Sequence, residues 1–255
     1  MNIQVLVAAM HQKNHDLLKK MNIQSNVIVG NQDDCNKIEE FDYNGFNAKY
    51  LTFNERGVGL NRNNALMRAN ADVCLLADDD MVYVDDYPEI VKKAYEDCPK
   101  ADVIVFNLME PHSLNKRYVI KKKKRVTCLN YLRYGAARVS FKLESVRKNA
   151  IYFNQCFGGG TEHCAGEDNL FLSACLKKGL KIYSYPAYIA ELTEERPSTW
   201  DTGDVDKYLR DKGALFKALS PRFWRLLCFQ DAIRHKKLYN RKLKEIFSLM
   251  IKSEK

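Results

Sequence analysis

Short apolar runs alternate with amphipathic stretches through most of the chain. Runs of strand length occupy residues 2–9, 26–30, 48–53, 73–77 and 102–108, and helical patterns occupy residues 15–21, 56–71 and 87–98. A strand that is buried on both faces is continuously apolar, whereas a helix that covers a sheet has an apolar stripe along one side. Because strands and helices alternate, the pattern predicts crossover connections, a largely parallel sheet and an α/β fold.

The pattern continues around a glycine-rich segment in the second half of the chain. Three consecutive glycines, at positions 158–160, form a pliable loop that lets a substrate approach the backbone closely. A helix is predicted to begin after Gly166 and to end at Gly179, and a strand is predicted over residues 180–186.

The last part of the chain is helical in pattern and basic. Helical spacing is predicted over residues 221–237 and again over residues 238–250. In the second stretch one apolar stripe contains Tyr239, Leu243, Ile246, Phe247 and Met250. Residues 221–255 contain ten Lys and Arg against three Asp and Glu, so they carry most of the net charge of +9 and leave the preceding residues nearly neutral.

The composition indicates a soluble globular protein with one substantial core. Of the 255 residues, 46% are hydrophobic and 29% are charged, which is ordinary for such proteins. We find no apolar run long enough for a transmembrane helix and no signal-peptide pattern at the start, so we expect neither a membrane span nor export by that route. The eight cysteines are scattered without a Cys-x-x-Cys pair, which predicts free thiols in a reducing cytoplasm.

Three consecutive carboxylates follow the buried run 73–77, in the sequence LLADDD. Asp78, Asp79 and Asp80 therefore lie at the exit of a predicted strand, where open α/β sheets bind ligands. Three adjacent negative charges are tolerable where solvent, basic side chains or a metal ion offset them. A solvated acidic turn would need no ligand, whereas Asp-x-Asp at a strand exit suits a hard divalent cation together with a substrate diphosphate.

A second pair of carboxylates, Glu167 and Asp168, opens the helix that follows the glycine loop. Carboxylates in the first turn of a helix stabilise it through the helix dipole, and this alone would explain them. A carboxylate beside a flexible loop can also remove a proton from an attacking hydroxyl. One acidic set could hold a metal and a diphosphate, and the other could accept a proton. This division fits a transfer reaction with a phosphate leaving group.

The motifs together resemble those of GT-A fold glycosyltransferases of family 2, close to the bacterial enzymes that build capsular and other surface polysaccharides. The segments that carry the resemblance are GVGLNRNNAL (57–66), LLADDD (75–80), FGGGTEHCAGEDNLFL (157–172), KKGLKIYSYP (177–186) and STWDTG (198–203). They occur in the order that the family has. The resemblance implies a Rossmann-like, mostly parallel sheet flanked by helices, with a helical C-terminal extension.

The resemblance also implies roles for individual positions. The donor nucleotide and sugar would lie against Ala8, Gln32, Asp33, Arg62, Asn63, Asp78 and Asp79, with Asp78 toward the ribose. Asp80 would ligate Mn²⁺ or Mg²⁺ on the diphosphate, and Asp168, beside Glu167, would be the general base. Gly159, Gly160 and Trp200 would form the acceptor side, where Trp200 would stack on a sugar unless it is simply a core residue.

Two positions depart from the family pattern. Many relatives have a late histidine as a further metal ligand, but the segment around Glu191 has none, so that Glu191 or water would take its place. Leu60 occupies a position that is often basic, which leaves the basic run 121–125 as another candidate for phosphate contacts; a solvated loop or sheet edge is the simpler interpretation of that run.

Two other functions compete with glycosyl transfer. LLADDDMV also fits the strand-end motif of haloacid-dehalogenase-type phosphotransferases, although that motif normally follows the first strand and the later acidic pair of that class is missing. Alternatively, the basic tail belongs to a non-catalytic protein that binds membranes or nucleic acid. The acidic cluster argues against nucleic acid as the main partner, and a helical hairpin packed on the catalytic domain would equally explain the tail.

The sequence therefore predicts a cytoplasmic, metal-dependent inverting glycosyltransferase with two parts. Residues 1–203 would form the catalytic domain and residues 204–255 a basic helical extension. The donor would be a nucleoside diphosphate sugar, most simply a UDP-sugar, and the acceptor a glycan or lipid-linked glycan. Residues 221–255 would be the part that touches the inner face of an anionic membrane.

Overall fold

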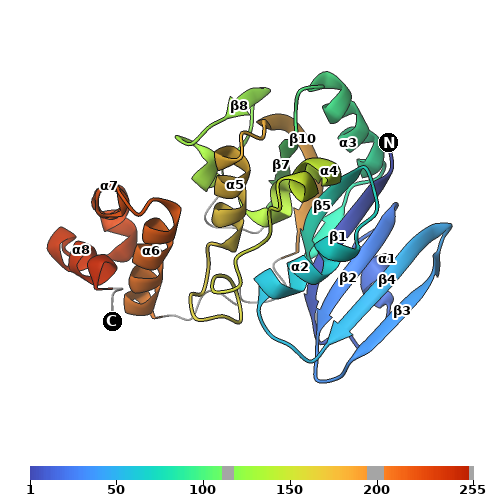
Figure 1. The fold of residues 1–255 in the computed structure, drawn as a ribbon, viewed down its shortest axis with the longest axis horizontal. Helices are drawn as coiled ribbons and strands as arrows, with labels where there is room; N and C mark the ends of the chain where they lie inside the picture. Colours follow the sequence, from blue (N-terminus) through green and yellow to red (C-terminus); the bar gives the residue numbers. More distant parts are fainter. Residues whose placement is uncertain (111–117, 194–203, 253–255) are drawn as a thin grey trace.

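A sheet of ten strands with helices on both faces forms most of the protein, in a computed structural model that describes residues 1–110, 118–193 and 204–252 (Figure 1). Its strands are β1 (Ile3–Met10), β2 (Asn26–Gln32), β3 (Lys37–Tyr43), β4 (Phe46–Phe53), β5 (Val73–Asp78), β6 (Met81–Tyr83), β7 (Val103–Met109), β8 (Lys124–Val126), β9 (Val139–Lys142) and β10 (Ile182–Leu192). The strand order is β3-β4-β2-β1-β5-β9-β7-β10-β6, and β8 pairs with β10.

The parallel part of the sheet is the part that the apolar runs predicted. Strands β4, β2, β1 and β5 are neighbours and run parallel, and β10 runs parallel to β7. The residues of β1, β2, β5 and β7 are almost continuously buried, as expected for strands covered on both faces. The predicted α/β architecture is therefore confirmed, although β10 continues well beyond the predicted end at residue 186.

Antiparallel strands that the sequence analysis did not identify make the sheet mixed. Strand β9 lies antiparallel between β5 and β7, β6 pairs with the end of β10, and β3 forms a hairpin with β4. Strand β3 is partly exposed at the edge of the sheet, so it lacks an apolar run. Its turn is nevertheless marked in the sequence, because Asn44 and Gly45 both have positive φ, which is typical of tight hairpins.

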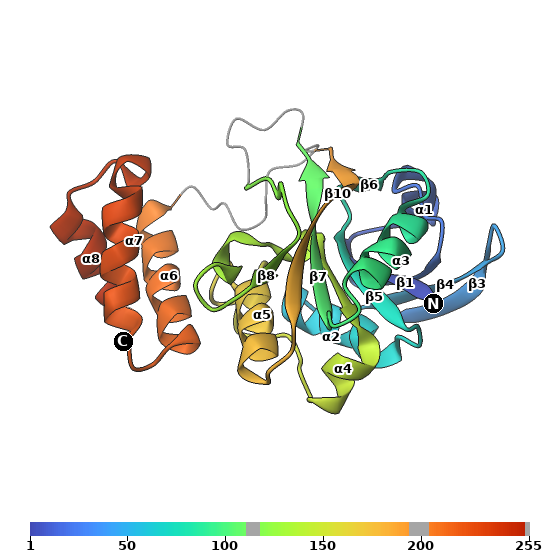
Figure 2. The ribbon, with the colours of Figure 1, turned by 90° about the horizontal axis from the view of Figure 1, so that it is seen from above.

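Helices cover the two faces of the sheet in separate groups (Figures 1 and 2). They are α1 (Asp16–Lys20), α2 (Val58–Arg68), α3 (Tyr87–Asp97), α4 (Leu143–Lys148) and α5 (Glu167–Lys177). Residues of α1 and α3 share one core with Val5, Val27 and Val29, whereas α2, α4 and α5 pack on the other face with Leu6 and Ile28. Because successive side chains along β1 and β2 point to opposite faces of the sheet, these strands contribute to a hydrophobic layer on each face.

Three helices follow the sheet and pack on one another at one end of the molecule (Figure 1). They are α6 (Val205–Leu219), α7 (Trp224–Tyr239) and α8 (Leu243–Ile251). The single stripe predicted over residues 238–250 was wrong in one respect, because the chain turns at Asn240, which has a φ of 49°, and divides the stripe between α7 and α8. Both parts still pack into the same core, since Tyr239 and Ile246 are buried together.

Two expectations from composition can be compared with the structure. All eight cysteines are free, as predicted, and Cys74 and Cys175 are among the buried ones. Within the residues that the structure describes, none of the helices combines the length and the apolar character needed to cross a bilayer.

Close packing of α6 on α8 generates a prediction for stability. A Cβ atom at Gly213 would overlap the backbone carbonyl oxygen of Met250, which no rotamer change can move. Glycine to alanine normally stabilises a helix, but here we expect Gly213→Ala to lower the free energy of unfolding by about 1–3 kcal/mol because of overpacking. Thermal unfolding measures the change.

The matched control for this prediction is Ala218→Gly, at an exposed position of the same helix. It reports the propensity effect alone, at a cost of about 1 kcal/mol. An unchanged or raised melting temperature for Gly213→Ala would contradict the close approach of α6 and α8.

Candidate active site

The carboxyl ends of three neighbouring strands bring the predicted donor residues together. In the register of the sheet Ala8 of β1 is paired with Gly30 of β2 on one side and with Asp78 of β5 on the other. Gln32 ends β2, and Asp33 follows it directly. Parallel strands thus place these residues at one edge of the sheet, which is where the sequence predicted a ligand site.

A buried arginine joins the two acidic segments. Arg62 of α2 is 4% exposed; its Nη2 lies 2.6 Å from Asp78 Oδ1, and its Nη1 lies 2.6 Å from Glu167 Oε1. Asp78 ends β5 and Glu167 begins α5, so one guanidinium connects three elements. The planar fork of arginine suits two carboxylates at once, which a lysine ammonium would not do with the same geometry.

Burial and nearby charges shift the pKa values of Arg62 and of Asp168. Burial would lower the pKa of Arg62, but Asp78 and Glu167 together outweigh it and raise that pKa, so the guanidinium stays charged. Burial, and then the negative charge of Glu167, raise the pKa of Asp168 to about 7, against an opposing effect of Arg62. A carboxyl with a pKa near neutrality is suited to accept a proton under physiological conditions.

Asp168 is held in the first turn of α5 and lies close to Gly135. Its Oδ1 accepts a hydrogen bond from the backbone N–H of Asn169 at 2.6 Å. A Cβ atom at Gly135 would lie 3.4 Å from Asp168 Oδ2, so the segment before the 3₁₀ turn η2 (Ala136–Arg138) packs against this carboxyl. The sequence analysis did not single out Gly135, because nothing in its local pattern links it to the acidic helix start.

The glycine loop lies directly on the beginning of α2. Gly159 O accepts a hydrogen bond from the Val58 N–H at 3.0 Å, and Gly160 approaches Gly57 closely. Gly158 has a φ of 104°, and a Cβ there would lie 2.7 Å from Glu167 Oε2 and would overlap Val58. The loop therefore needs glycine at position 158 both for its backbone conformation and for its contact with the Arg62 ion pair.

Two of the residues predicted to contact the sugar donor form hydrogen bonds with the protein's own backbone. The side-chain amide of Asn63 is buried, donates to Phe153 O at 2.9 Å and accepts from the Phe153 N–H at 2.8 Å. Gln32 Oε1 accepts from the Gly57 N–H at 2.7 Å. These contacts give Asn63 and Gln32 supporting roles, because they fix α2 and so the position of Arg62.

Asp33 lies beside basic residues that the sequence analysis did not consider. Lys13 Nζ donates to both oxygens of Asp33 at 2.8 Å, and His11 Nδ1 lies 3.4 Å from Asp33 Oδ1. The hydrogen bond from Lys13 is the largest cause that lowers the pKa of Asp33 to about 2. These residues lie in the turn after β1, so parallel pairing of β1 with β2 brings them to the same edge.

The other two strand-end carboxylates are tied to neighbouring turns. Asp79 Oδ2 accepts from the Gln12 side chain at 3.3 Å, and the backbone carbonyl of Asp80 accepts from the Thr193 N–H at 2.9 Å. Thr193 follows β10 directly, so the end of β10 lies against the triple aspartate. Glu191, in the same strand, pairs with Val82 rather than with an aspartate.

The carboxylate oxygens at this turn suit a metal ion that is shared with a substrate. Among the described residues, no three His, Cys, Asp or Glu side chains are grouped as a metal site would require. A complete protein cage is therefore not formed there. Mg²⁺ and Mn²⁺ are commonly held by one or two carboxylates and complete their shell with water and phosphate oxygens, which fits Asp80 and its neighbours.

The basic run 121–125 is exposed, and its β8 part lies away from this edge. Part of it forms β8, and Lys124 pairs with Ser184 near the beginning of β10, whereas Thr193 follows the end of that strand. Nine residue steps separate Ser184 from Thr193, or roughly 30 Å at about 3.3 Å per residue. The run is thus exposed and partly a sheet edge, as its simpler interpretation held, and the phosphate contact stays a prediction. Trp200 lies outside the described residues.

The first of the C-terminal helices also supports the site, which the sequence did not indicate. Asp211 of α6 is buried and accepts hydrogen bonds from the Cys164 N–H at 3.0 Å and from Lys207 Nζ at 2.6 Å. His163 Nδ1 lies 3.2 Å from the same carboxylate. Asp211 therefore holds the loop that leads from the glycines to Asp168.

Comparisons with known proteins agree with this arrangement. The sequence matches the family model for glycosyl transferase family 2 over residues 30–157, half of the chain. No curated protein matches it significantly. Residues 1–349 of S. aureus TarS in complex with UDP-GlcNAc give a TM-score of 0.66 at 13% identity, covering 98% of this chain and 91% of that one.

Further structures of TarS give similar TM-scores and identities. S. aureus TarS itself matches with a TM-score of 0.64 at 14% identity and is covered over 55% of its length. Its residues 1–349 in complex with UDP match with a TM-score of 0.62 at 14% identity, covering 98% of this chain and 90% of that chain. At such low identity the likeness shows a shared fold.

The raised pKa of Asp168 predicts a stability that depends on pH. The unfolded state releases this proton near the ordinary pKa of 3.8, and the folded state near 7. A raised carboxyl pKa therefore makes the protein lose stability as pH rises from about 4 to 7. Asp168→Asn stays neutral and keeps an acceptor for the Asn169 N–H, so we expect its melting temperature to exceed that of the wild type increasingly over this range.

The matched control is Asp86→Asn, an exposed carboxylate whose positive φ asparagine tolerates. Thermal unfolding between about pH 3 and pH 8 compares the three proteins, because these limits bracket the two pKa values of 3.8 and about 7. If the curves for Asp168→Asn and the wild type run parallel, Asp168 is not a buried carboxyl with a raised pKa.

Proposed function

The chain belongs to glycosyl transferase family 2, and from this premise we propose that it is an inverting enzyme that transfers a sugar from a nucleoside diphosphate to a glycan hydroxyl in surface polysaccharide synthesis. Family membership makes it a glycosyltransferase with a GT-A fold rather than a haloacid-dehalogenase-type phosphotransferase. The observation that carries the proposal is the bridge by Arg62, because it sets Asp168 beside the carboxylates at the end of β5.

We propose a UDP-sugar as the donor. The structures of TarS with UDP-GlcNAc and with UDP, which share the fold, support this class of nucleotide. Asp33 and Ala8 would contact the nucleotide, Asp78 the ribose, and Asp79 the donor from the neighbouring turn. Arg62, Asn63 and Gln32 would act mainly through the backbone and carboxylates that they hold in place.

We propose that Asp80 holds Mn²⁺ or Mg²⁺ together with the donor diphosphate. Such an ion would offset the negative charge that develops on the leaving group. Glu191 or water would be the further ligand of this cation.

We propose that Asp168 is the general base. Its carboxylate would take the proton of the acceptor hydroxyl, whose oxygen forms a bond to the anomeric carbon while the bond from that carbon to the diphosphate breaks on the opposite face. The electron pair of the broken bond leaves with the nucleoside diphosphate. Glu167 is engaged by Arg62, which supports Asp168 rather than Glu167 as the base. Gly159, Gly160 and Trp200 would border the acceptor.

We propose that residues 1–203 are the catalytic domain and residues 204–255 a basic extension. The acceptor would be a glycan or lipid-linked glycan, and a cytoplasmic enzyme would reach it at the inner face of the membrane through residues 221–255. Their excess of Lys and Arg supports an anionic surface as the partner.

Calorimetric titration with UDP, GDP, CMP and dTDP, with and without Mn²⁺, tests the donor and the metal. We expect selective binding of UDP that requires Mn²⁺, with affinity reduced at least tenfold in Asp80→Asn, because the metal loses a carboxylate ligand. Asp97→Asn, distant on α3, is the control carboxylate. No binding of any nucleotide would overturn the donor, and equal binding by Asp80→Asn would overturn the metal ligand.

The general base is tested by turnover of a UDP-sugar at varied pH. We expect kcat to fall as pH drops below about 7, where Asp168 becomes protonated. Asp168→Asn should retain UDP binding but lose about 10²–10⁴-fold in kcat and lose this acid limb. Near-normal turnover by Asp168→Asn would remove it from the base role. Release of UDP from the donor in the presence of acceptor provides the measurement.

A further inference from the structure

Helix α7 carries apolar side chains on two faces, and one of these faces is exposed. Trp224, Cys228 and Ala232 are buried against α6 and α8. On the outer side Leu226 is 63% exposed and Ile233 is 54% exposed. Large exposed apolar side chains grouped on one helix are typical of an interaction site.

The exposed residues form one stripe along the helix. At about 100° per residue, Leu226, Phe229 and Ile233 fall within an arc of about 60°. Phe229 is 44% exposed and rests edge-on against Phe247 of α8, with ring centroids 5.9 Å apart. Leu226 and Ile233 are therefore the side chains that the fold leaves uncovered on this face.

Basic residues flank the stripe on both sides. By the same helical geometry Arg225 and Lys236 lie along one border, and Lys237 and Arg234 lie along the other; all four are exposed. The single acid of α7, Asp231, is buried on the inner side. The outer face of α7 thus presents apolar and cationic side chains without a carboxylate of its own.

The inner side of α7 fixes which face looks outward. Asp231 binds Lys212 Nζ at 2.9 Å and His235 Nδ1 at 2.9 Å, and it accepts a hydrogen bond from the Tyr239 hydroxyl at 2.7 Å. This buried network joins α7 to α6. The helix is therefore not free to rotate its apolar stripe inward.

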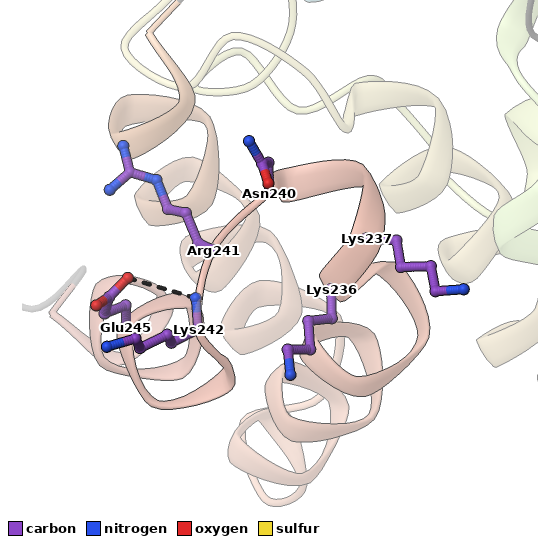
Figure 3. A pocket seen from close by; sticks show the side chains of 6 residues that line it. All are labelled: Lys236, Lys237, Asn240, Arg241, Lys242 and Glu245. Atoms are coloured by element: carbon purple, nitrogen blue, oxygen red, sulfur yellow. Dashed lines mark hydrogen bonds between the residues drawn. The ribbon is translucent and has the colours of Figure 1, made fainter.

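An open basic pocket continues this face at the end of α7 (Figure 3). It has a volume of about 580 Å³ and is lined by Lys236, Lys237, Asn240, Arg241, Lys242 and Glu245. Glu245, its one acid, accepts a hydrogen bond from the backbone N–H of Lys242 at 3.4 Å. Cationic side chains around such a hollow suit a phosphate group.

We propose that the outer face of α7 lies flat on an anionic lipid membrane, with Leu226, Phe229 and Ile233 entering the boundary between headgroups and acyl chains. The flanking Arg and Lys side chains contact lipid phosphates, and the pocket of Figure 3 receives a headgroup. An apolar stripe between two cationic borders is complementary to this surface. This face is the part of residues 221–255 that would make the membrane contact proposed above. Its binding to lipid does not depend on which nucleotide sugar is the donor or on which residue is the general base.

Charge and chemistry favour a membrane over the other occupants of such a face. A symmetric pair of chains joined through this stripe would bring cationic borders together without acidic partners. Nucleic acid would pair with the cations, but Leu226 and Ile233, the most exposed members of the stripe, have no ring for stacking on bases, and the ring of Phe229 is packed against Phe247. A lipid interface satisfies both the apolar and the cationic side chains.

Sedimentation of the full chain with vesicles tests the proposal. We expect binding to equimolar phosphatidylcholine and phosphatidylglycerol, weaker binding to phosphatidylcholine alone, and a decrease at high salt. The double variant Leu226→Ser/Ile233→Ser should lower the partition coefficient by at least tenfold, because both apolar contacts are lost. Arg234→Gln/Lys237→Gln should weaken binding to the anionic vesicles selectively.

The matched control is Leu129→Ser, which makes the same chemical change at a side chain that is 90% exposed outside the bundle. It should bind vesicles like the wild type. A wild-type chain that stays in the supernatant with anionic vesicles, or a Leu226→Ser/Ile233→Ser variant that binds equally well, would overturn the proposal. So would a wild-type dimer in gel filtration that this variant converts to a monomer.

Nucleotide titration of the same proteins separates this inference from the proposed function. Leu226 and Ile233 lie outside the site of Arg62 and Asp168, so the variant should bind UDP as the wild type does. Normal UDP binding without vesicle binding would remove the membrane face alone, whereas vesicle binding without UDP binding would remove the donor alone.

Discussion

The geometry of the site depends on one buried guanidinium between two carboxylates. Arg62 of α2 reaches Asp78 at the end of β5 and Glu167 at the beginning of α5 at 2.6 Å each. Without this positive charge, burying Glu167 beside Asp168 and near Asp78 would be costly, because each carboxylate would raise the pKa of the others. Arg62 therefore permits an acidic cluster in which the carboxyl of Asp168 has its pKa near 7.

Much of the surrounding sequence serves to hold Arg62 in place. Gln32 fixes the N–H of Gly57 at the beginning of α2, and Asn63 fixes the backbone at Phe153 on its other side. Gly158 lets the glycine loop pass between Val58 and Glu167. The motifs that resemble the family thus have a structural reason of their own, because polar and glycine residues around α2 fix the backbone that carries Arg62.

The parallel core of the fold was predictable from the sequence, and its antiparallel additions were not. Continuous apolar runs identify β1, β2, β5 and β7 because both faces of these strands are buried. Strand β3 is a partly exposed edge, so only its Asn44-Gly45 turn marks it, and β6 and β9 are too short for a pattern. The break at Asn240 was missed because apolar positions on both sides of the turn enter the same core.

For the site, the sequence identified the acidic segments but not their partners. Asp78 and Asp168 are recognisable because each lies where an apolar pattern begins or ends. The link from Arg62 to Glu167 joins residues 105 positions apart, and the contact of Gly135 with Asp168 depends on a 3₁₀ turn without periodicity. Such contacts follow from the packing of elements, which local patterns do not encode.

The C-terminal helices are coupled to the active site through α6, and this affects how the basic extension can be studied. Asp211 holds the loop at Cys164, and Gly166, with a φ of 116°, packs so closely on Leu215 that a Cβ atom would lie 2.7 Å away. Removing the extension would therefore disturb the approach to Asp168 as well as the basic face of α7. Substitutions on the outer face of α7 leave these contacts intact, because its inner side, with Asp231, is the side that faces α6. The two roles of the helical bundle, supporting a loop and presenting a surface, are thus separable by point substitution and not by deletion.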